Sequence, residues 1–203
     1  MKRFLAILVG VVILVSLDAQ AQTVVLNADG LDSAYVENIN KRSQKIVDGL
    51  HLNDAQKAEN VRNIIANRYI LLNKIHEANK DNAAQRDAEL YKHHFELASA
   101  LALYLDDEQI DAVKDGMTFR RLKRDYNATL DMIPSLTEEE KAQVLIWLKE
   151  AREYAMDAAD SKGKHFWFDK YRGRTNNWLS AKGYDLKKER DNWMKRIEEA
   201  KKQ

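Results

Sequence analysis

The chain has 203 residues, with 33 basic and 32 acidic side chains, seven glycines, one proline and no cysteine. The lack of cysteine excludes disulfides, thiol chemistry and lipid attachment at a cysteine. A near-neutral charge gives no general attraction to nucleic acid or anionic lipid, so we expect neither as a partner. Few helix breakers amid abundant Ala, Leu, Glu and Lys predict an all-α chain.

The first 21 residues have the pattern of a secretory signal peptide. A basic leader precedes an apolar run over residues 4–17, and Ala19 and Ala21 supply the small residues that signal peptidase recognises. The run is too short for a membrane anchor. We expect cleavage after Ala21 and a secreted or periplasmic protein in which residues 22–203 form a single helical domain.

Capping signals divide the first half of the expected mature chain into helices. A first helix is predicted over about Ser33–Asp48, ended by Gly49 in a left-handed conformation. Asn53 is the expected N-cap of a second helix that continues to about Asn79. A third helix is predicted over about residues 82–104.

Similar signals recur in the second half of the chain. The expected helices are a short one ended by Gly116, a basic one within 118–132, a long one over about 138–160, an aromatic one over about 164–183, and a last one capped by Asp185. The connection 161–163 is short enough to make the long and aromatic helices antiparallel. Together these elements predict an irregular antiparallel bundle of about six or seven helices.

The most unusual composition lies in residues 164–185, where aromatic and basic residues alternate. On a helix, Trp167, Tyr171, Arg174 and Trp178 fall within about 60° of one another, which places a guanidinium on an aromatic face. This face is either core around a structural cation or a binding surface for a sugar ring and its carboxylate or sulfate. Asn177, beside Trp178, is a further ligand-binding candidate.

Arg152 lies near the apolar stripe of the long helix, about 40° from Leu148 on the helical wheel. A buried arginine requires an anionic partner, because an unpaired buried charge is very costly. Arg152 and Glu153 therefore belong either to a ligand site shared with Arg174 or to a salt-bridge network that joins two helices, and we favour the network. For Arg174 itself we expect a carboxylate partner on the long helix, and a structural pair should contribute about 3 kcal/mol.

Three polar residues of the second helix, Tyr69, Asn73 and His76, align on one side at spacings of four and three. They could form a polar wall of a cleft or an ordinary half-buried hydrogen-bonding face. The adjacent His93 and His94 lack a second ligand pair, so we interpret His94 as a satisfied core histidine and expect no metal site. Nucleophile and phosphate-loop signatures are missing from the sequence, so we assign no catalytic residue, expect no cofactor and find no support for an enzyme.

Two family resemblances bear on function. The capped Leu-Thr-x-x-Glu helix start that contains Thr137 and Glu140 resembles Spy/CpxP-type periplasmic chaperones. Across nearly all of the expected mature chain, the sequence looks like a secreted family from Bacteroidetes catalogued as domain of unknown function 3826. The positions that carry this second resemblance are Lys45-Ile46-Val47; Val61, Ile64-Ile65-Ala66, Tyr69, Leu72-Asn73 and Ile75-His76; Gly116-Met117-Thr118; Glu150-Ala151-Arg152-Glu153 and Ala155-Met156-Asp157; and Tyr171, Gly173-Arg174, Asn176-Asn177-Trp178-Leu179-Ser180 and Gly183-Tyr184-Asp185.

The second resemblance implies export and a frequent association with polysaccharide use, but no known activity. The segment 119–124 departs from the pattern because it is more basic. Two functional hypotheses follow. The first is a carbohydrate-associated accessory or binding protein whose aromatic and arginine cleft takes an acidic or plant-type oligosaccharide or a protein partner. The alternative is a periplasmic chaperone or stress-response helical protein.

Overall fold

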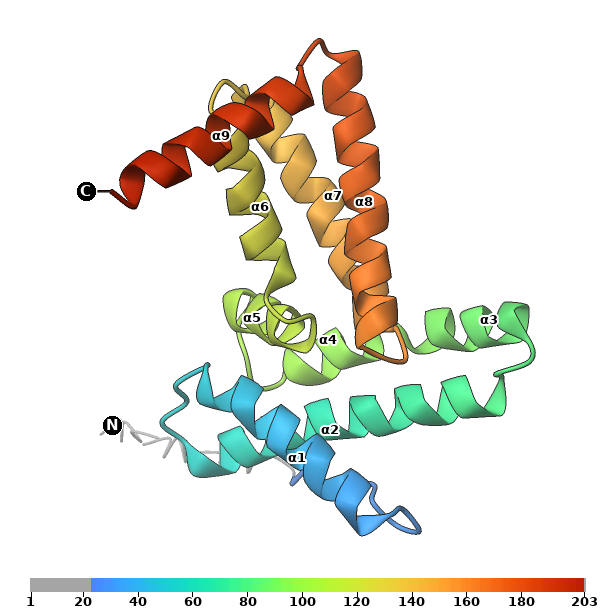
Figure 1. Cartoon of the computed structure of the whole chain (residues 1–203). Helices are drawn as coiled ribbons and strands as arrows, with labels where there is room; N and C mark the ends of the chain where they lie inside the picture. The colour runs from blue at the N-terminus through green and yellow to red at the C-terminus, as the bar shows by residue number, and fades with distance from the viewer. Residues whose placement is uncertain (1–22, 203) are drawn as a thin grey trace, which may run out of the picture.

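The computed structural model describes residues 23–202, which form nine helices and no strand (Figure 1). In chain order the helices are α1 (Ser33–Asp48), α2 (Ala55–Ala78), α3 (Ala83–His93), α4 (Glu96–Leu101), α5 (Asp107–Met117), α6 (Arg121–Met132), α7 (Glu138–Met156), α8 (Ser161–Ala181) and α9 (Leu186–Ala200). The all-α prediction is confirmed. The expected signal peptide lies outside the described residues, and no helix within 23–202 has the length and apolarity to cross a membrane.

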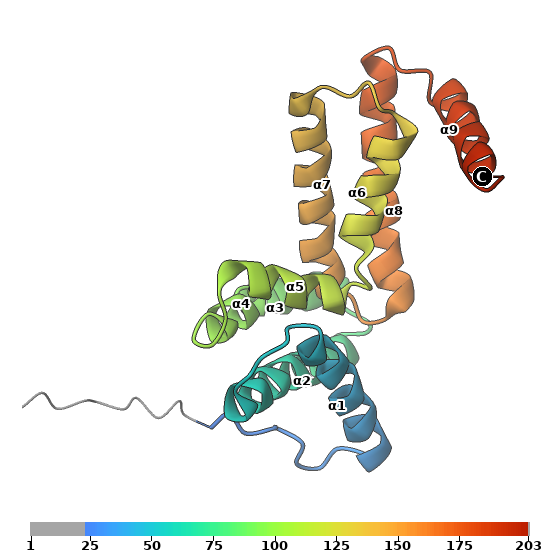
Figure 2. The same cartoon turned by 90° about the vertical axis from the view of Figure 1, so that its left-hand side faces the viewer.

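The helices form a base and a bundle that rises from it. Helices α1–α5 make the base, whereas α6, α7 and α8 stand on it and α9 crosses their far ends (Figures 1 and 2). α7 and α8 pack against each other along most of their length and run antiparallel, as predicted. The base and the bundle meet where α5 and the start of α8 approach the C-terminal end of α7.

Each part has its own apolar core. The base core joins α1, α2, α4 and α5, and Met156 from the end of α7 inserts into it. The bundle core lies between α6, α7 and α8 and contains Phe168 and Tyr171. The aromatic helix α8 therefore buries one face in the bundle, and its opposite face remains at the surface.

Local capping chemistry explains where several helices begin. α5 and α7 both start with capping boxes, Asp106 with Gln109 and Thr137 with Glu140, and Asp185 caps α9. The expected cap of α2 was wrong by one residue. Asp54 caps this helix instead of Asn53, because its carboxylate accepts the N–H of Lys57 at 2.9 Å.

Two glycines serve close packing. α1 ends just before Gly49, as predicted, whereas α5 continues through Gly116 to Met117. Gly49 has φ −72°, so it is not left-handed, and a Cβ there would lie 3.2 Å from Nη2 of Arg120. Gly116 lies inside α5, and a Cβ there would lie 2.9 Å from Cγ1 of Ile46 on α1. Their lack of a side chain lets neighbouring elements approach.

Tertiary contacts move three other helix boundaries. The helix expected over 82–104 divides into α3 and α4, because Nη1 of Arg68 donates to the carbonyl of His93 at 2.7 Å and takes the place of a helical N–H. α7 ends at Met156 and not near residue 160, because Nζ of Lys164 donates to the last carbonyls, those of Ala155 (3.1 Å) and Met156 (3.3 Å). α8 starts at Ser161, capped by Asp160, so the expected connection 161–163 is helical.

Candidate functional site

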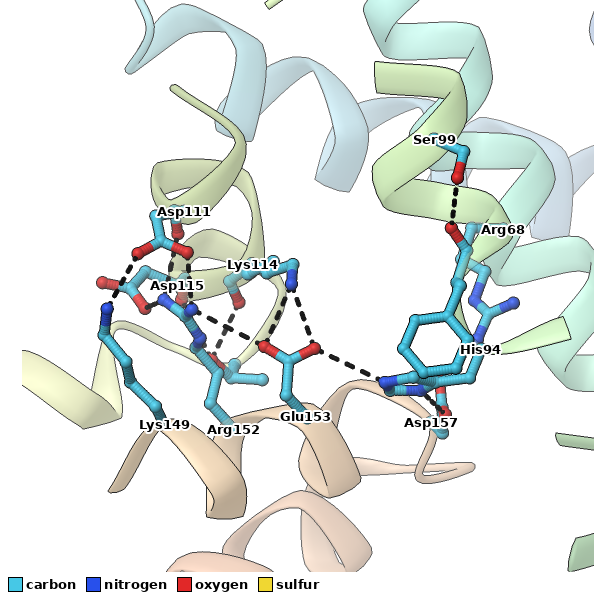
Figure 3. Close-up of polar contacts among 12 residues, drawn as sticks. Arg68, His94, Ser99, Asp111, Lys114, Asp115, Lys149, Arg152, Glu153 and Asp157 are labelled. Carbon is cyan, nitrogen blue, oxygen red and sulfur yellow. Dashed lines mark hydrogen bonds and ion pairs between the residues drawn. The ribbon is translucent and has the colours of Figure 1, made fainter. Parts of the chain in front are cut away.

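Arg152 is buried where α7 meets α5, with 3% of its surface exposed. Its Nη1 donates to Asp115 at 2.7 Å and its Nη2 donates to Asp111 at 2.6 Å (Figure 3). The two aspartates are four residues apart on α5 and therefore face the same way. Burial disfavours the charged guanidinium, but these carboxylates outweigh that cost and raise the pKa of Arg152. Arg152 thus joins two helices, as the salt-bridge interpretation predicts.

Glu153 extends this network from α5 towards the α3–α4 junction. Nζ of Lys114 contacts both carboxylate oxygens, at 3.0 and 3.1 Å, and Nε2 of His94 lies 3.5 Å from Oε2. Burial alone would raise the pKa of Glu153, yet the hydrogen bonds from His94 and Lys114 lower it to about 2. Glu153 is therefore an ion-paired carboxylate and cannot hold a proton for acid catalysis near neutral pH.

His94 lies between the carboxylates of Glu153 on α7 and of Asp157, the residue that follows α7. Its Nδ1 is 2.6 Å from Oδ2 of Asp157, opposite the contact with Glu153 (Figure 3). The hydrogen bond with Asp157, followed by the one with Glu153, raises the pKa of His94 to about 9. His94 is satisfied, as expected, but by two acids and not by an apolar core. Within residues 23–202, no three His, Asp or Glu side chains form a group that could hold a metal ion.

Asp157 connects the network to α2. Its carboxylate also accepts from Nη2 of Arg68, and its backbone carbonyl lies 2.8 Å from Nε2 of His76. The side chains of Arg68 and Asp157 are 3% and 13% exposed. This charge network, comprising Arg68, His94, Asp111, Lys114, Asp115, Arg152, Glu153 and Asp157, links four elements and ties the bundle to the base. Its geometry is that of an internal structural network.

A third buried arginine explains part of the basic segment 119–124. Arg121 is 5% exposed, and its Nε donates to Asp125 at 2.9 Å. Its other nitrogens contact Asp169 and His165 at the start of α8. This residue was not predicted, because a basic run on a weakly patterned helix resembles a solvated face. Arg121 fastens α6 to α8.

The aromatic candidates lie in a row of rings between α7 and α8, in two separate groups of ring contacts. Tyr154 stacks on Trp167 with centroids 4.5 Å apart, and it also stacks on Tyr171 at 6.3 Å. Further along, Trp147 meets Trp178 edge to face at 5.1 Å. We call this row, Trp147, Tyr154, Trp167, Tyr171 and Trp178, the aromatic ladder. The shared face of Trp167, Tyr171 and Trp178 was predicted, whereas the two rings from α7 were missed.

Cations lie along the aromatic ladder. The guanidinium carbon of Arg174 is 4.7 Å from the centre of the Trp147 ring and 5.8 Å from that of Tyr171. Nζ of Lys170 is 4.7 Å from the centre of the Trp167 ring. Arrangements of this kind are attractive because the ring face is electron-rich. The guanidinium of Arg174 therefore lies close to two rings of the ladder.

The carboxylate partner of Arg174 is Glu150, on the long helix as expected. Nη1 of Arg174 lies 3.4 Å from Oε2 of Glu150, and the two side chains are 52% and 43% exposed. The expected contribution of about 3 kcal/mol assumed a partly buried carboxylate and is therefore too large. Exposed pairs typically contribute about 0–1 kcal/mol, because water screens both charges.

The ladder is partly buried and partly open to solvent. Tyr171 and Trp147 are 6% and 9% exposed and belong to the bundle core. Tyr154 is 48% exposed, and Phe166, which meets Trp167 edge to face at 5.6 Å, is 58% exposed. The buried rings of Trp147 and Tyr171 thus belong to the core, whereas Tyr154 and the neighbouring Phe166 form an exposed aromatic surface beside them.

Three of the candidates lie apart from both features. Tyr69 packs in the base, and burial raises its pKa to about 12. Asn73 is exposed on α2, and Asn177 is exposed on α8. Of the three residues aligned on α2, the structure brings only His76 to the charge network.

We compared the chain with known protein families. A protein-family model described as "Protein of unknown function (DUF3826)" matches residues 36–87 and 78–199. The chain belongs to this family. The DUF3826 match covers both the charge network and the aromatic ladder, so both lie within the family's own region, and the resemblance to it is confirmed. No curated protein matches the chain.

Proposed function

We propose that the protein is exported and binds an acidic oligosaccharide, such as a fragment of a plant polysaccharide, along the aromatic ladder. One observation carries this proposal: the ladder has exposed rings at its edge and cations on its faces. A structural core alone does not require a 58% exposed Phe166 beside a half-exposed Tyr154. Aromatic surfaces with a few polar groups are typical of sites that bind ring-shaped ligands.

The length of the ladder favours an oligosaccharide over a single sugar. Trp167 and Trp178 are eleven residues apart on α8, which corresponds to about 17 Å along a helix. Sugar rings have apolar C–H faces that can lie on aromatic rings, and their hydroxyls can reach polar side chains on either side. An extended ligand could therefore contact several rings of the ladder at once.

The cations favour a ligand that carries carboxylates or sulfates. Arg174 makes one loose contact with Glu150, at 3.4 Å, and both groups reach solvent. A carboxylate or sulfate on the ligand could replace Glu150 at this guanidinium at little cost, because a bidentate pair is stronger than a single long contact. Lys170 provides a second positive charge beside Trp167.

A glycan array followed by calorimetry tests this proposal. We expect the purified protein to bind acidic oligosaccharides and Trp167→Ala to weaken every bound glycan by about fivefold or more, since one stacked ring contributes on the order of 1 kcal/mol or more. Arg174→Ala should weaken acidic glycans much more than their carboxyl-reduced counterparts. Tyr91→Ala is the matched control, because this ring is 74% exposed on α3, away from the ladder.

Two results would contradict the proposal. One is an array on which no glycan binds above background. The other is a bound glycan whose affinity is the same for wild type, Trp167→Ala and Arg174→Ala, since the ligand would then lie elsewhere on the protein.

A further inference from the structure

Three asparagines on α2 fix the extended segment that precedes α1. Asn60 accepts the N–H of Val24 at 2.9 Å, and Asn63 donates to the carbonyl of Val24 at 2.8 Å. Asn67 bonds two further backbone groups of segment 24–27, both at 2.8 Å. The asparagines are spaced three and four apart, so they lie in one row along the helix. These bonds make segment 24–27 a fixed wall along α2.

A groove of about 700 Å³ lies between this wall, α2 and α4. Its apolar lining consists of Val24, Ile64, Leu71, Leu97, Ala100 and Leu103. Leu103, which borders the groove, is 78% exposed. The volume falls in the range of about 300–1,000 Å³ that is typical of small-molecule sites, and an apolar lining favours an apolar ligand.

Arg68 is a polar, charged side chain in the wall of the groove. It belongs to the groove wall, yet only 4% of its surface is exposed. Its Nη1 donates to His93 and its Nη2 to Asp157, but its Nε has no hydrogen-bond partner among the described residues. A buried N–H without an acceptor is unfavourable, so a ligand oxygen that reached it would be stabilised.

The charges around Arg68 indicate that this oxygen is uncharged. Asp157, whose side chain is 13% exposed, already compensates the buried guanidinium as its ion-pair partner. Glu96, which also borders the groove, adds a negative charge that would repel an anionic head group. A carboxylate would therefore gain little attraction from Arg68 and would be repelled by Glu96.

From these features we propose that the groove binds an uncharged amphiphile. Its alkyl chain lies between segment 24–27, α2 and α4, and its hydroxyl, ester or amide oxygen accepts the N–H of Arg68 Nε. This site is separate from the aromatic ladder, because the groove lies in the base and the ladder lies on the bundle. It is thus independent of the proposed oligosaccharide binding.

Calorimetry with two matched amphiphiles tests the site. The probes are 1-monodecanoylglycerol and decanoate, both below the concentrations at which they aggregate. We expect saturable binding of the neutral probe and about tenfold weaker binding of decanoate. Leu103→Asp places a charge in the apolar lining and should weaken the neutral probe by at least about tenfold.

Ile146→Asp is the matched control, because Ile146 is a 57% exposed apolar residue on α7, outside the groove. It should leave the affinity within about twofold of wild type. Arg68→Lys retains a positive charge for Asp157 but removes the Nε–H, so it should reduce the preference for monodecanoylglycerol over decanoate. If that variant does not fold, the Leu103 and Ile146 pair still decides the question.

The inference is overturned by any of three results. These are no saturable binding of the neutral probe, equal losses in Leu103→Asp and Ile146→Asp, or decanoate binding as tightly as its neutral counterpart.

Discussion

Replacing Arg152 with methionine tests whether the charge network holds the bundle on the base. Methionine fills much of the same volume, so the main loss is the charge and not packing. Arg152 is 3% exposed and makes contacts of 2.7 Å with Asp115 and 2.6 Å with Asp111. Removing one partner of a buried ion pair typically costs about 3–5 kcal/mol, because the remaining charge is uncompensated.

The exposure of the aspartates determines where in that range the effect falls. The side chain of Asp111 is 44% exposed and that of Asp115 is 25% exposed, so water can stabilise both after the substitution. We therefore expect a loss of about 3 kcal/mol in the free energy of unfolding, at the lower end of the range. For a chain of this size, this loss corresponds to a decrease of roughly 6–12 °C in the melting temperature.

Thermal and urea unfolding, followed by circular dichroism, measure this loss. Arg174→Ala is the control, because it removes an arginine of the same charge from a pair whose side chains are 52% and 43% exposed. It should cost no more than about 2 kcal/mol, because an exposed ion pair contributes about 0–1 kcal/mol and the contact with the Trp147 ring about 0.5–1 kcal/mol. If Arg152→Met has the same melting temperature as wild type, the network does not stabilise the fold. If both substitutions cost the same, the argument from burial is wrong.

Further predictions concern close packing and pH. Gly116→Ala should destabilise the protein by about 1–3 kcal/mol, because the new Cβ would lie 2.9 Å from Cγ1 of Ile46, and Ile46→Ala in the same chain should relieve part of this loss. Gly173→Ala should instead stabilise by up to about 1 kcal/mol, since nothing lies within 4 Å of the added Cβ and alanine favours the helix, and chemical denaturation should show these opposite signs. The pKa of His94, raised from 6.5 to about 9, means that its ion pairs contribute fully below about pH 6.5 and that this contribution is lost as the pH rises through about 9. The difference in free energy of unfolding between wild type and His94→Gln should therefore shrink from pH 6 to pH 10, and a constant difference would contradict the prediction. Burial lowers the pKa of Lys164 to about 8, which has the opposite effect on stability. This effect is present in both proteins and cancels in the comparison.

The helices and their caps were largely predictable from neighbouring residues. α1 spans Ser33–Asp48 as expected, and the start of α7 follows from Thr137 and Glu140. A capping bond joins groups about three residues apart, so its partners are set by the local sequence. The antiparallel packing of α7 and α8 also followed from the short connection between them.

Within the aromatic ladder, the sequence determined only what lies on a single helix. Trp167, Tyr171 and Trp178 share a face because the period of the helix places them there. Trp147 and Tyr154 join them because of the register in which α7 packs on α8. That register depends on how all the buried side chains fit together, and no short pattern encodes it.

The charge network was decided by the tertiary structure. The position of Arg152 beside an apolar stripe predicted an anionic partner, but its partners Asp111 and Asp115 lie on a separate helix about forty residues earlier. The break between α3 and α4 has the same origin, since it depends on Arg68 reaching the carbonyl of His93. A buried charge requires an opposite charge close to it in space, whereas its spacing along the chain is unconstrained, so the need for a partner is visible in the sequence and the identity of that partner is set by the fold.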